Sequence, residues 1–199
     1  SNAGEIYRFD AGGNLTVLHS LAYYTEGSTA RAGLLQAADG YFYGTTSTGG
    51  EFGTGAIFKM DSAGTVTVLH SFAFDGSEGA NSRARLVQGS DGNFYGTTQT
   101  GGTYGGGTVF RMTSAGAVTV LHAFNPSSEG SGPFAGLTLG AGGYFYGTTF
   151  NDGINGYGTA YRIDQAGNFT TLHSFGTEAA NPSSELILAS DGYFYGTTR

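Results

Sequence analysis

The stretch Asp91-Gly92-Asn93-Phe94-Tyr95-Gly96-Thr97-Thr98 decides the fold, because the chain contains it four times. The other copies occupy residues 39–46, 142–149 and 191–198, and the third copy begins with Gly142 in place of Asp. The tyrosines at the centre of the four copies are 52, 51 and 49 residues apart. Such a regular period is the signature of a repeat protein whose units stack on one another.

Composition indicates short strands joined by glycine turns. Glycine makes up 37 of the 199 residues and proline only 3, which excludes a collagen helix. A content of 39 % hydrophobic and 14 % aromatic residues excludes a disordered chain. No stretch has the i, i+3, i+4 apolar spacing of an amphipathic helix. We therefore expect an all-β domain without helices.

Each unit contains four predicted strands. Between the second and third copies they cover residues 86–90, 93–98, 108–113 and 118–124, with tight turns at Asp91-Gly92 and Ala115-Gly116. The last strand alternates, which places His122 and Phe124 on one face. Four antiparallel strands, called A to D here, form the blade of a β-propeller. Tryptophan, on which the kelch and WD repeat signatures depend, is absent.

The phase of the repeat predicts how the ring closes. Residues 5–21 supply only strands C and D, three complete blades follow, and residues 186–198 supply only strands A and B. Pairing of these two half-blades would close a four-bladed ring of ~50-residue repeats without a free edge. The alternative is half of an eight-bladed ring, which is completed by a second copy as a homodimer or by further repeats of a longer protein.

The chain is expected to form one domain. The repeats divide it into residues 4–54, 55–106, 107–157 and 158–199, with no linker between them. Residues 1–3, Ser-Asn-Ala, look like the remnant of a cleaved expression tag and are left out of the fold prediction.

Charge and cysteine content exclude several classes of function. The net charge of −7, with only eight Lys and Arg, argues against a nucleic-acid partner, which requires clustered basic residues. No apolar run approaches the 18 residues of a membrane span. The absence of cysteine removes disulfides and thiolate chemistry.

The motif resembles a known repeat. Residues 86–98, followed by Gly101-Gly102, residues 107–110 and residues 120–122, are similar to the GloVer-type tandem repeat of bacterial proteins. The resemblance covers residues 4–199. It departs at Gly142 and at residues 151–153, where Asn-Asp-Gly replaces the usual Thr-Gly-Gly. The resemblance implies an exported, secreted or cell-surface protein and no established activity.

The repeated polar residues are expected to serve the fold. The histidines of strand D lie in four separate blades and cannot meet, so we expect each to be buried and bonded to a backbone or threonine partner, with no metal site and no cofactor. The threonine pairs at the end of strand B should fix the exit from that strand. Each glycine before such a pair should make room for a neighbouring aromatic ring. The basic residue of strand C and the Asp two residues later should form an ion pair.

Candidate ligand-binding residues lie in the long loops. An up-and-down order of strands places the B-to-C and D-to-A loops at one end of the propeller, called the long-loop face here. Carboxylates and aromatics gather there: Tyr23, Tyr24, Glu26, Phe52, Glu78, Tyr104, Glu129, Asp152, Tyr157 and Glu178. Such a surface suits sugar stacking, a cation or a protein partner.

Two hypotheses of function follow. The first is a non-catalytic extracellular binding or spacer module, because nearly every polar candidate repeats four times whereas an active site breaks symmetry. The alternative is a polysaccharide hydrolase or lyase that draws its acid and base from the loop carboxylates.

Overall fold

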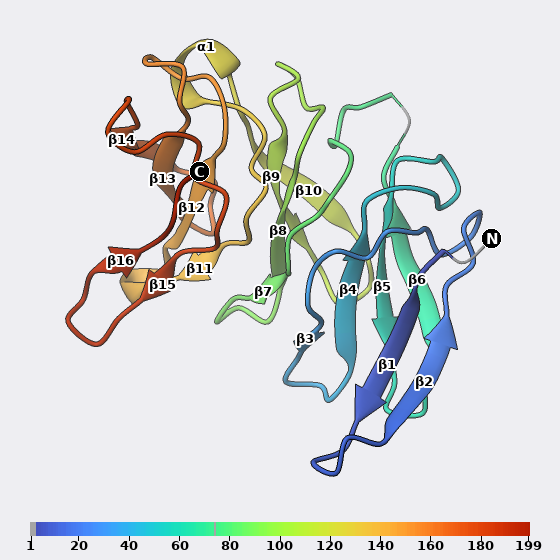
Figure 1. Ribbon diagram of the computed structural model, residues 1–199. Helices are drawn as coiled ribbons and strands as arrows, with labels where there is room; N and C mark the ends of the chain where they lie inside the picture. The colour runs from blue at the N-terminus through green and yellow to red at the C-terminus, as the bar shows by residue number, and fades with distance from the viewer. Residues whose placement is uncertain (1–2, 74) are drawn as a thin grey trace.

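The computed structural model describes residues 3–73 and 75–199, and nearly all of its regular structure is strand (Figure 1). The strands are β1 (Glu5–Phe9), β2 (Leu15–Ser20), β3 (Leu35–Gln36), β4 (Phe42–Thr46), β5 (Ala56–Met60), β6 (Val66–Ser71), β7 (Val87–Gln88), β8 (Phe94–Thr98), β9 (Thr108–Met112), β10 (Val118–Ala123), β11 (Thr138–Leu139), β12 (Phe145–Thr149), β13 (Thr159–Ile163), β14 (Phe169–Ser174), β15 (Ile187–Leu188) and β16 (Phe194–Tyr195). The all-β prediction is confirmed.

Three four-stranded antiparallel sheets form the complete blades, in the orders β3-β4-β5-β6, β7-β8-β9-β10 and β11-β12-β13-β14. Sequential order within each sheet is the up-and-down arrangement of a propeller blade. Two further sheets have two strands each, β1-β2 and β15-β16. These are the predicted half-blades, with strands C and D at the start of the chain and strands A and B at its end.

The prediction of no helices was wrong at two short segments. The helix α1 (Pro126–Glu129) begins at Asn125, whose side chain accepts a hydrogen bond from the Ser127 N–H, and Pro126 suits its first turn. The 3-10 turn η1 (Ala141–Gly143) falls where Gly142 replaces the turn aspartate. Neither segment changes the blade pattern. Among the described residues, no helix has the length and hydropathy of a membrane span.

The prediction that side chains alternate strictly between the two faces of strand D was also wrong. The register between β9 and β10 shifts between Val120 and His122, so Leu121 is an extra residue in its strand. With strict alternation, Leu121 would point away from the core. The β-bulge lets it pack against a core cluster instead. The same shift occurs in β5-β6, in β13-β14 and in the half-blade β1-β2.

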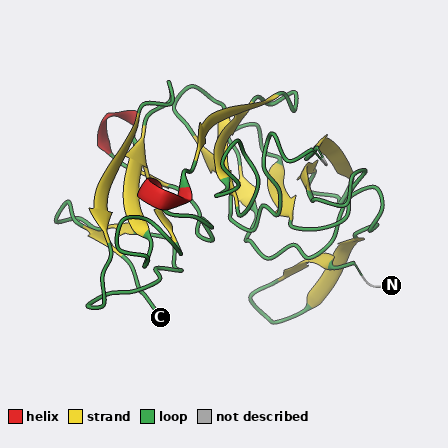
Figure 2. Ribbon diagram, turned by 90° about the horizontal axis from the view of Figure 1, so that it is seen from above, coloured by secondary structure: helices red, strands yellow, loops and turns green. Residues whose placement is uncertain are grey.

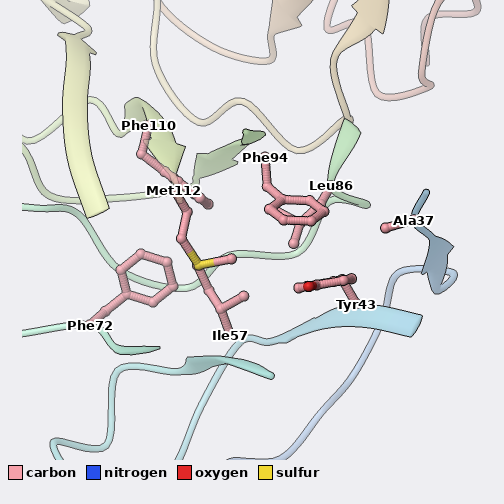
Figure 3. Packing of buried hydrophobic residues seen from close by; sticks show 8 residues of the cluster. All are labelled: Ala37, Tyr43, Ile57, Phe72, Leu86, Phe94, Phe110 and Met112. Atoms are coloured by element: carbon pink, nitrogen blue, oxygen red, sulfur yellow. The ribbon is translucent and has the colours of Figure 1, made fainter. Parts of the chain in front are cut away.

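The core lies between neighbouring blades. Figure 3 shows one cluster, in which Tyr43 and Ile57 of one blade meet Phe94 and Met112 of the next. The rings of Tyr43 and Phe94 stack with their centroids 4.0 Å apart. The following blades repeat this contact in Tyr95 with Phe145 at 4.2 Å and Tyr146 with Phe194 at 4.1 Å. Burial of each such ring contributes roughly 1.5–3 kcal/mol to stability.

The glycine inside strand B makes room for an aromatic ring of strand C, as predicted. A Cβ on Gly96 would lie 2.6 Å from Phe110 Cζ and 2.7 Å from Leu86 Cδ2. Gly44 meets Phe58 in the same way, at 2.5 Å. These approaches are too close for any side chain, so the blade requires glycine at this position.

The predicted ion pair on strand C was wrong. Asp164 instead organises the C-to-D turn, because its carboxylate accepts hydrogen bonds from the N–H groups of Ala166 and Asn168 at 2.9 Å. Arg162 lies over the ring of Tyr144, 4.9 Å from its centroid. The hydrogen bond from the Asn168 side chain, aided by the backbone N–H groups, holds the pKa of Asp164 below its ordinary value.

The A-to-B turn uses its aspartate in a related way. Asp91 accepts a hydrogen bond from the Tyr95 hydroxyl at 2.8 Å, and Asp39 accepts one from Tyr43 at 2.7 Å. Burial, together with the bond to Asp91, raises the pKa of Tyr95 above its ordinary value. The phenol therefore stays protonated and donates this bond at neutral pH.

The two half-blades do not pair in this structure. Figure 2 shows the blades along an arc whose ends are the half-blades, and β1-β2 and β15-β16 remain separate sheets. Closure of the ring therefore stays a prediction. Of the expected tag remnant, Ser1 and Asn2 lie outside the described residues, while Ala3 is buried and its carbonyl accepts a bond from Thr29 N–H.

Replacement of Gly96 by Ala should destabilise the protein by about 1–3 kcal/mol, because the new methyl group overpacks the site against Phe110 and Leu86. Gly33→Ala is the matched control, since its Cβ would meet only Arg85 Cδ at 4.0 Å. Urea unfolding measures both variants. Equal stabilities would contradict the steric role of the strand-B glycine.

Asp164→Ala should lower the melting temperature at pH 7, and the difference from the parent protein should shrink as the pH falls. A carboxylate whose folded pKa is depressed stabilises the fold above its unfolded pKa, near 3.8, and loses this effect as the pH drops through the folded value. Thr113→Ala is the control. Thr113 occupies the equivalent turn of the preceding blade, where its hydroxyl accepts a hydrogen bond from the Ala117 N–H and does not titrate. Calorimetry between pH 7 and about pH 2 tests the contrast.

Candidate functional site

The long loops meet at one end of the molecule. The D-to-A and B-to-C loops are joined by isolated β-bridges, Ser28 to Thr48, Ala80 to Thr100 and Ser131 to Asn151. Figure 1 shows α1, which belongs to a D-to-A loop, at this end, opposite the tight turns of the blades. The predicted long-loop face therefore exists, with two loops from each complete repeat.

Three of the predicted carboxylates are held by the repeated histidines. Nε2 of His19 lies 2.8 Å from Glu26, that of His70 lies 2.8 Å from Glu78, and that of His122 lies 3.0 Å from Glu129. Glu26 and Glu129 also accept a backbone N–H from their own loop. Each pair therefore fastens a D-to-A loop to strand D.

The predicted environment of the histidines was right in part. They are hydrogen-bonded, but their partner is a carboxylate rather than a backbone group or a threonine, and their side chains are half-buried, with 18 to 24 % exposed. The ring of His122 also stacks on Phe169, with centroids 3.9 Å apart. The fourth copy differs, because His173 and Glu178 are both exposed.

Asp152 is also engaged. Its carboxylate accepts a hydrogen bond from the Ser131 hydroxyl, which links a B-to-C loop to the preceding D-to-A loop. Within the described chain, Glu178 is thus the one predicted carboxylate without a hydrogen bond or ion pair.

Most of the predicted aromatics are exposed. Tyr24 is 82 % exposed and Tyr104 59 %, and Phe52 is also exposed. Tyr23 packs edge-on against Tyr24, with centroids 5.1 Å apart. Tyr157 is half-buried. The long-loop face therefore offers aromatic rings at the tips of several loops. Sequence reasoning missed one apolar tip, Ile154, which is 76 % exposed.

The threonine pairs serve the fold, as expected. The first member links neighbouring blades, since the Thr45 hydroxyl donates to Ala84 O and that of Thr97 to Ala135 O. The second member fixes a loop, since the hydroxyl of Thr46 donates to the carbonyl of Glu26. These three hydroxyls are buried and bonded within the protein. In the third pair, the buried Thr148 Oγ1 has no hydrogen-bond partner among the described residues.

A second site, the axial pocket, was missed by the sequence reasoning. It has a volume of about 470 Å³ and is lined by residues that precede strand A in all four repeats: Ala32, Gly33, Arg83, Ala84, Arg85, Phe134, Ala135, Gly136, Ser183 and Glu185. Here Arg85 and Glu185 lie 3.7 Å apart. Arg83 lies over the ring of Phe134, and its buried Nε has no hydrogen-bond partner among the described residues.

A signal for the axial pocket was present in the repeats. The position three residues before the repeated leucine of strand A holds Arg31, Arg83, Phe134 and Ser183, and the position just before that leucine holds Gly33, Arg85, Gly136 and Glu185. All of these except Arg31 line the pocket. Two positions that vary beside a repeated leucine are not determined by the common fold. Only the three-dimensional arrangement of the blades shows that these positions meet at one axis.

Metal-binding geometry is not formed by the described residues. Within residues 3–73 and 75–199, no group of three or more histidine and acidic side chains is placed to hold a metal ion. The His-Glu pairs lie in separate blades, so each supplies two ligand groups at most.

Comparison with known proteins supports the fold. The sequence profile described as the Gloeobacter/Verrucomicrobia repeat matches residues 1–199. No curated protein sequence is significantly similar to the chain.

Among solved structures, the extracellular domain of a putative one-component system from B. thetaiotaomicron is similar, with a TM-score of 0.68 and 11 % identity over 98 % of this chain and 24 % of that one. The periplasmic gluconolactonase of Pseudomonas aeruginosa has a TM-score of 0.63 and 16 % identity, over 98 % of this chain and 57 % of its own. A putative 6-phosphogluconolactonase from Bacteroides uniformis has a TM-score of 0.60 and 18 % identity, over 96 % and 56 %. The chain therefore spans about a quarter to just over half the length of these proteins.

His122→Ala should lower the free energy of unfolding by about 1–3 kcal/mol, because it removes the imidazole partner of Glu129 and a stacked ring. His173→Ala is the matched control in the fourth copy, where the ring is exposed and no carboxylate holds it. We expect a clearly smaller loss there. Chemical denaturation of both variants decides the matter, and equal losses would refute the loop-fastening role of the pair.

Proposed function

Because the chain belongs to the Gloeobacter/Verrucomicrobia repeat family over its whole length, we propose that it is a non-catalytic recognition module of a secreted or cell-surface bacterial protein. Its ligand is a carbohydrate, bound on the long-loop face. The observation that carries this proposal is the set of exposed aromatic rings in the long loops, where four of the five predicted carboxylates are hydrogen-bonded within the protein.

The exposed rings fit a sugar ligand. Tyr24, Phe52 and Tyr104 belong to three different loops, and none is buried beneath its own loop. Aromatic side chains present a large apolar face with little conformational entropy to lose, which suits stacking on pyranose rings. Tyr23, packed against Tyr24, limits the freedom of that ring. A ring that is already restricted before binding loses less entropy when a ligand stacks on it.

The carboxylates argue against the hydrolase or lyase alternative. A two-carboxylate mechanism requires an acid and a base that face the same sugar bond, about 5 to 10 Å apart. Glu26, Glu78 and Glu129 are instead each bound to the histidine of their own blade. Catalysis would have to break such a pair before the carboxylate could act.

Location outside the cytoplasm is part of the proposal. The solved structure from B. thetaiotaomicron is an extracellular domain, and the one from Pseudomonas aeruginosa is a periplasmic enzyme. The net charge of −7 suits a protein that does not bind nucleic acid.

Binding to a panel of polysaccharides, measured by glycan array and affinity electrophoresis, tests the proposal. Tyr24→Ala and Tyr104→Ala should each weaken binding on the order of tenfold, because truncation of an interface aromatic costs more than about 1 kcal/mol. Tyr41→Ala is the control, because Tyr41 is 39 % exposed but lies at the tight-turn end of its blade.

Equal loss in all three variants would contradict the proposed face. Silence of the parent protein across the panel would favour a spacer or a protein ligand instead. Release of new reducing ends by the protein, abolished by Glu78→Gln, would favour the hydrolase.

A further inference from the structure

The axial pocket contains an arginine that the protein itself does not use. Within residues 3–73 and 75–199, the guanidinium of Arg83 makes no hydrogen bond and no ion pair, and its Nε is buried without a partner. A guanidinium has five N–H donors in one plane, and a buried donor without an acceptor is destabilising. Arg83 lines the pocket, so a bound acceptor there would satisfy these donors.

The segment that carries Arg83 is held in place before any ligand binds. Arg83 and Arg85 flank Ala84, whose carbonyl accepts a hydrogen bond from the Thr45 hydroxyl of the preceding blade at 3.2 Å. The guanidinium of Arg83 also lies over the ring of Phe134, 5.8 Å from its centroid. A side chain restricted in this way loses less entropy when a ligand binds to it.

A second arginine makes the pocket positive. Arg85 lies 3.7 Å from Glu185, which is longer than a direct hydrogen bond, and both side chains are partly exposed. Two arginines therefore face one glutamate among the lining residues, in a protein whose net charge is −7. This local excess favours a ligand with a single negative charge.

The other lining groups suit a ligand that also has hydroxyl groups. The Glu185 carboxylate accepts hydrogen bonds, the Ser183 hydroxyl donates and accepts them, and Phe134 adds apolar surface. A bare inorganic anion would use neither the acceptor nor the ring, and Glu185 would repel it. A sugar acid has a carboxylate for the arginines, hydroxyls for Glu185 and an apolar ring face.

Glycines leave space in the pocket. The repeat position that holds Arg85 and Glu185 in two repeats holds Gly33 and Gly136 in the other two. A Cβ on Gly136 would lie 3.3 Å from Glu185 Oε2, so a larger residue there would crowd the carboxylate. The volume of about 470 Å³ lies within the roughly 300–1,000 Å³ of small-molecule sites. One sugar residue fits such a space.

The pocket lies at the same end of the blades as the long-loop face. Its lining residues Ala84 and Ala135 accept hydrogen bonds from Thr45 and Thr97, which stand near the end of strand B, just before the B-to-C loop. A polysaccharide bound by the loop aromatics can therefore place one of its residues at the axis.

We propose that the axial pocket binds a sugar acid through its carboxylate, with Arg83 as the principal contact. The carboxylate accepts paired hydrogen bonds from the Arg83 guanidinium, Arg85 adds a second positive charge, and Glu185 accepts hydrogen bonds from the sugar hydroxyls. The negative charge of the ligand follows from the pocket alone, whereas the choice of a sugar rests on the proposed carbohydrate function.

Titration calorimetry with glucuronate, glucose, acetate and inorganic phosphate tests the class of ligand. Glucuronate should bind at least about tenfold more tightly than each of the other three, because only glucuronate combines one carboxylate with a hydroxylated ring. Its affinity should fall as salt is added, since salt screens the attraction between charges. Equal binding of acetate, or tighter binding of glucose or phosphate, would overturn the proposal.

Substitution of Arg83 tests the site. Arg83→Gln should weaken glucuronate binding by about 10- to 100-fold, because it removes charge-assisted hydrogen bonds. Arg31→Gln is the matched control, since Arg31 has the same repeat position but is exposed and does not line the pocket. It should bind like the parent protein. Equal affinities of these two variants would refute the role of Arg83.

Two further variants refine the assignment. Arg83→Lys keeps the charge without the planar fork, so its affinity should be intermediate, and its melting temperature shows whether the fold is intact. Glu185→Gln should reduce the preference for glucuronate over acetate, because the amide does not repel a bare anion. An unchanged preference would contradict the contact of Glu185 with the sugar.

Tyr24→Ala separates this inference from the proposed function. It should bind glucuronate like the parent protein, while its affinity for a polyuronate should fall, because only the polymer reaches the loop tips. Equal affinities of the parent protein for glucuronate and polyuronate would make a free sugar acid the ligand of the pocket.

The two proposals fail in different ways. If neutral polysaccharides bind through Tyr24 and glucuronate does not bind, the axial site is refuted and the proposed function stands. If glucuronate binds through Arg83 while Tyr24→Ala changes no polysaccharide affinity, the axial site stands and the long-loop face is refuted.

Discussion

Stacking of a strand-B tyrosine on the phenylalanine of the next blade is the contact on which the arrangement of blades depends. Tyr43, Tyr95 and Tyr146 each make it, with centroids 4.0 to 4.2 Å from the partner ring. The contact requires the rest of the motif. The turn aspartate holds the phenol of Tyr43 and of Tyr95, the glycine after each tyrosine lets strand C pack close, and the first threonine ties the strand to the next blade.

A division of labour follows from this arrangement. In the first three copies, the histidine and glutamate that occur in every repeat are used inside the protein, as in His70 and Glu78, which lie 2.8 Å apart. Side chains free to meet a ligand are those that the repeats do not share, such as Tyr24 at a loop tip and Arg83 at the axis. Recognition is therefore carried by the variable positions of a constant frame.

The sequence was sufficient to predict what is local and repeated. Strand positions, tight turns and the close packing at Gly96 follow from patterns within one unit, and the structure confirms them. The partner of His122 could not be predicted in this way, because Glu129 reaches it through the path of a loop. The bulge at Leu121 depends on packing against the neighbouring blade, which the alternation of strand D does not reveal.

The candidate site shows the same limit more strongly. The aromatics of the long-loop face could be found by counting strands, because the direction of each strand determines the end at which its loop lies. The axial pocket could not, since Arg85 and Glu185 come from different repeats and meet only when several blades surround one axis. The sequence shows that these positions vary among the repeats, but only the three-dimensional structure shows that they meet at the axis.

An interface that repeats without change contains no information about how many blades it joins. Duplication or loss of one whole repeat would leave each tyrosine-to-phenylalanine stack as it is, so the chain can change length without a new contact having to arise. Only residues that reach across the axis, such as Arg85 with Glu185, sense the size of the ring. In such an architecture the number of blades can drift during evolution, and the axis is where selection would have to act to hold it constant.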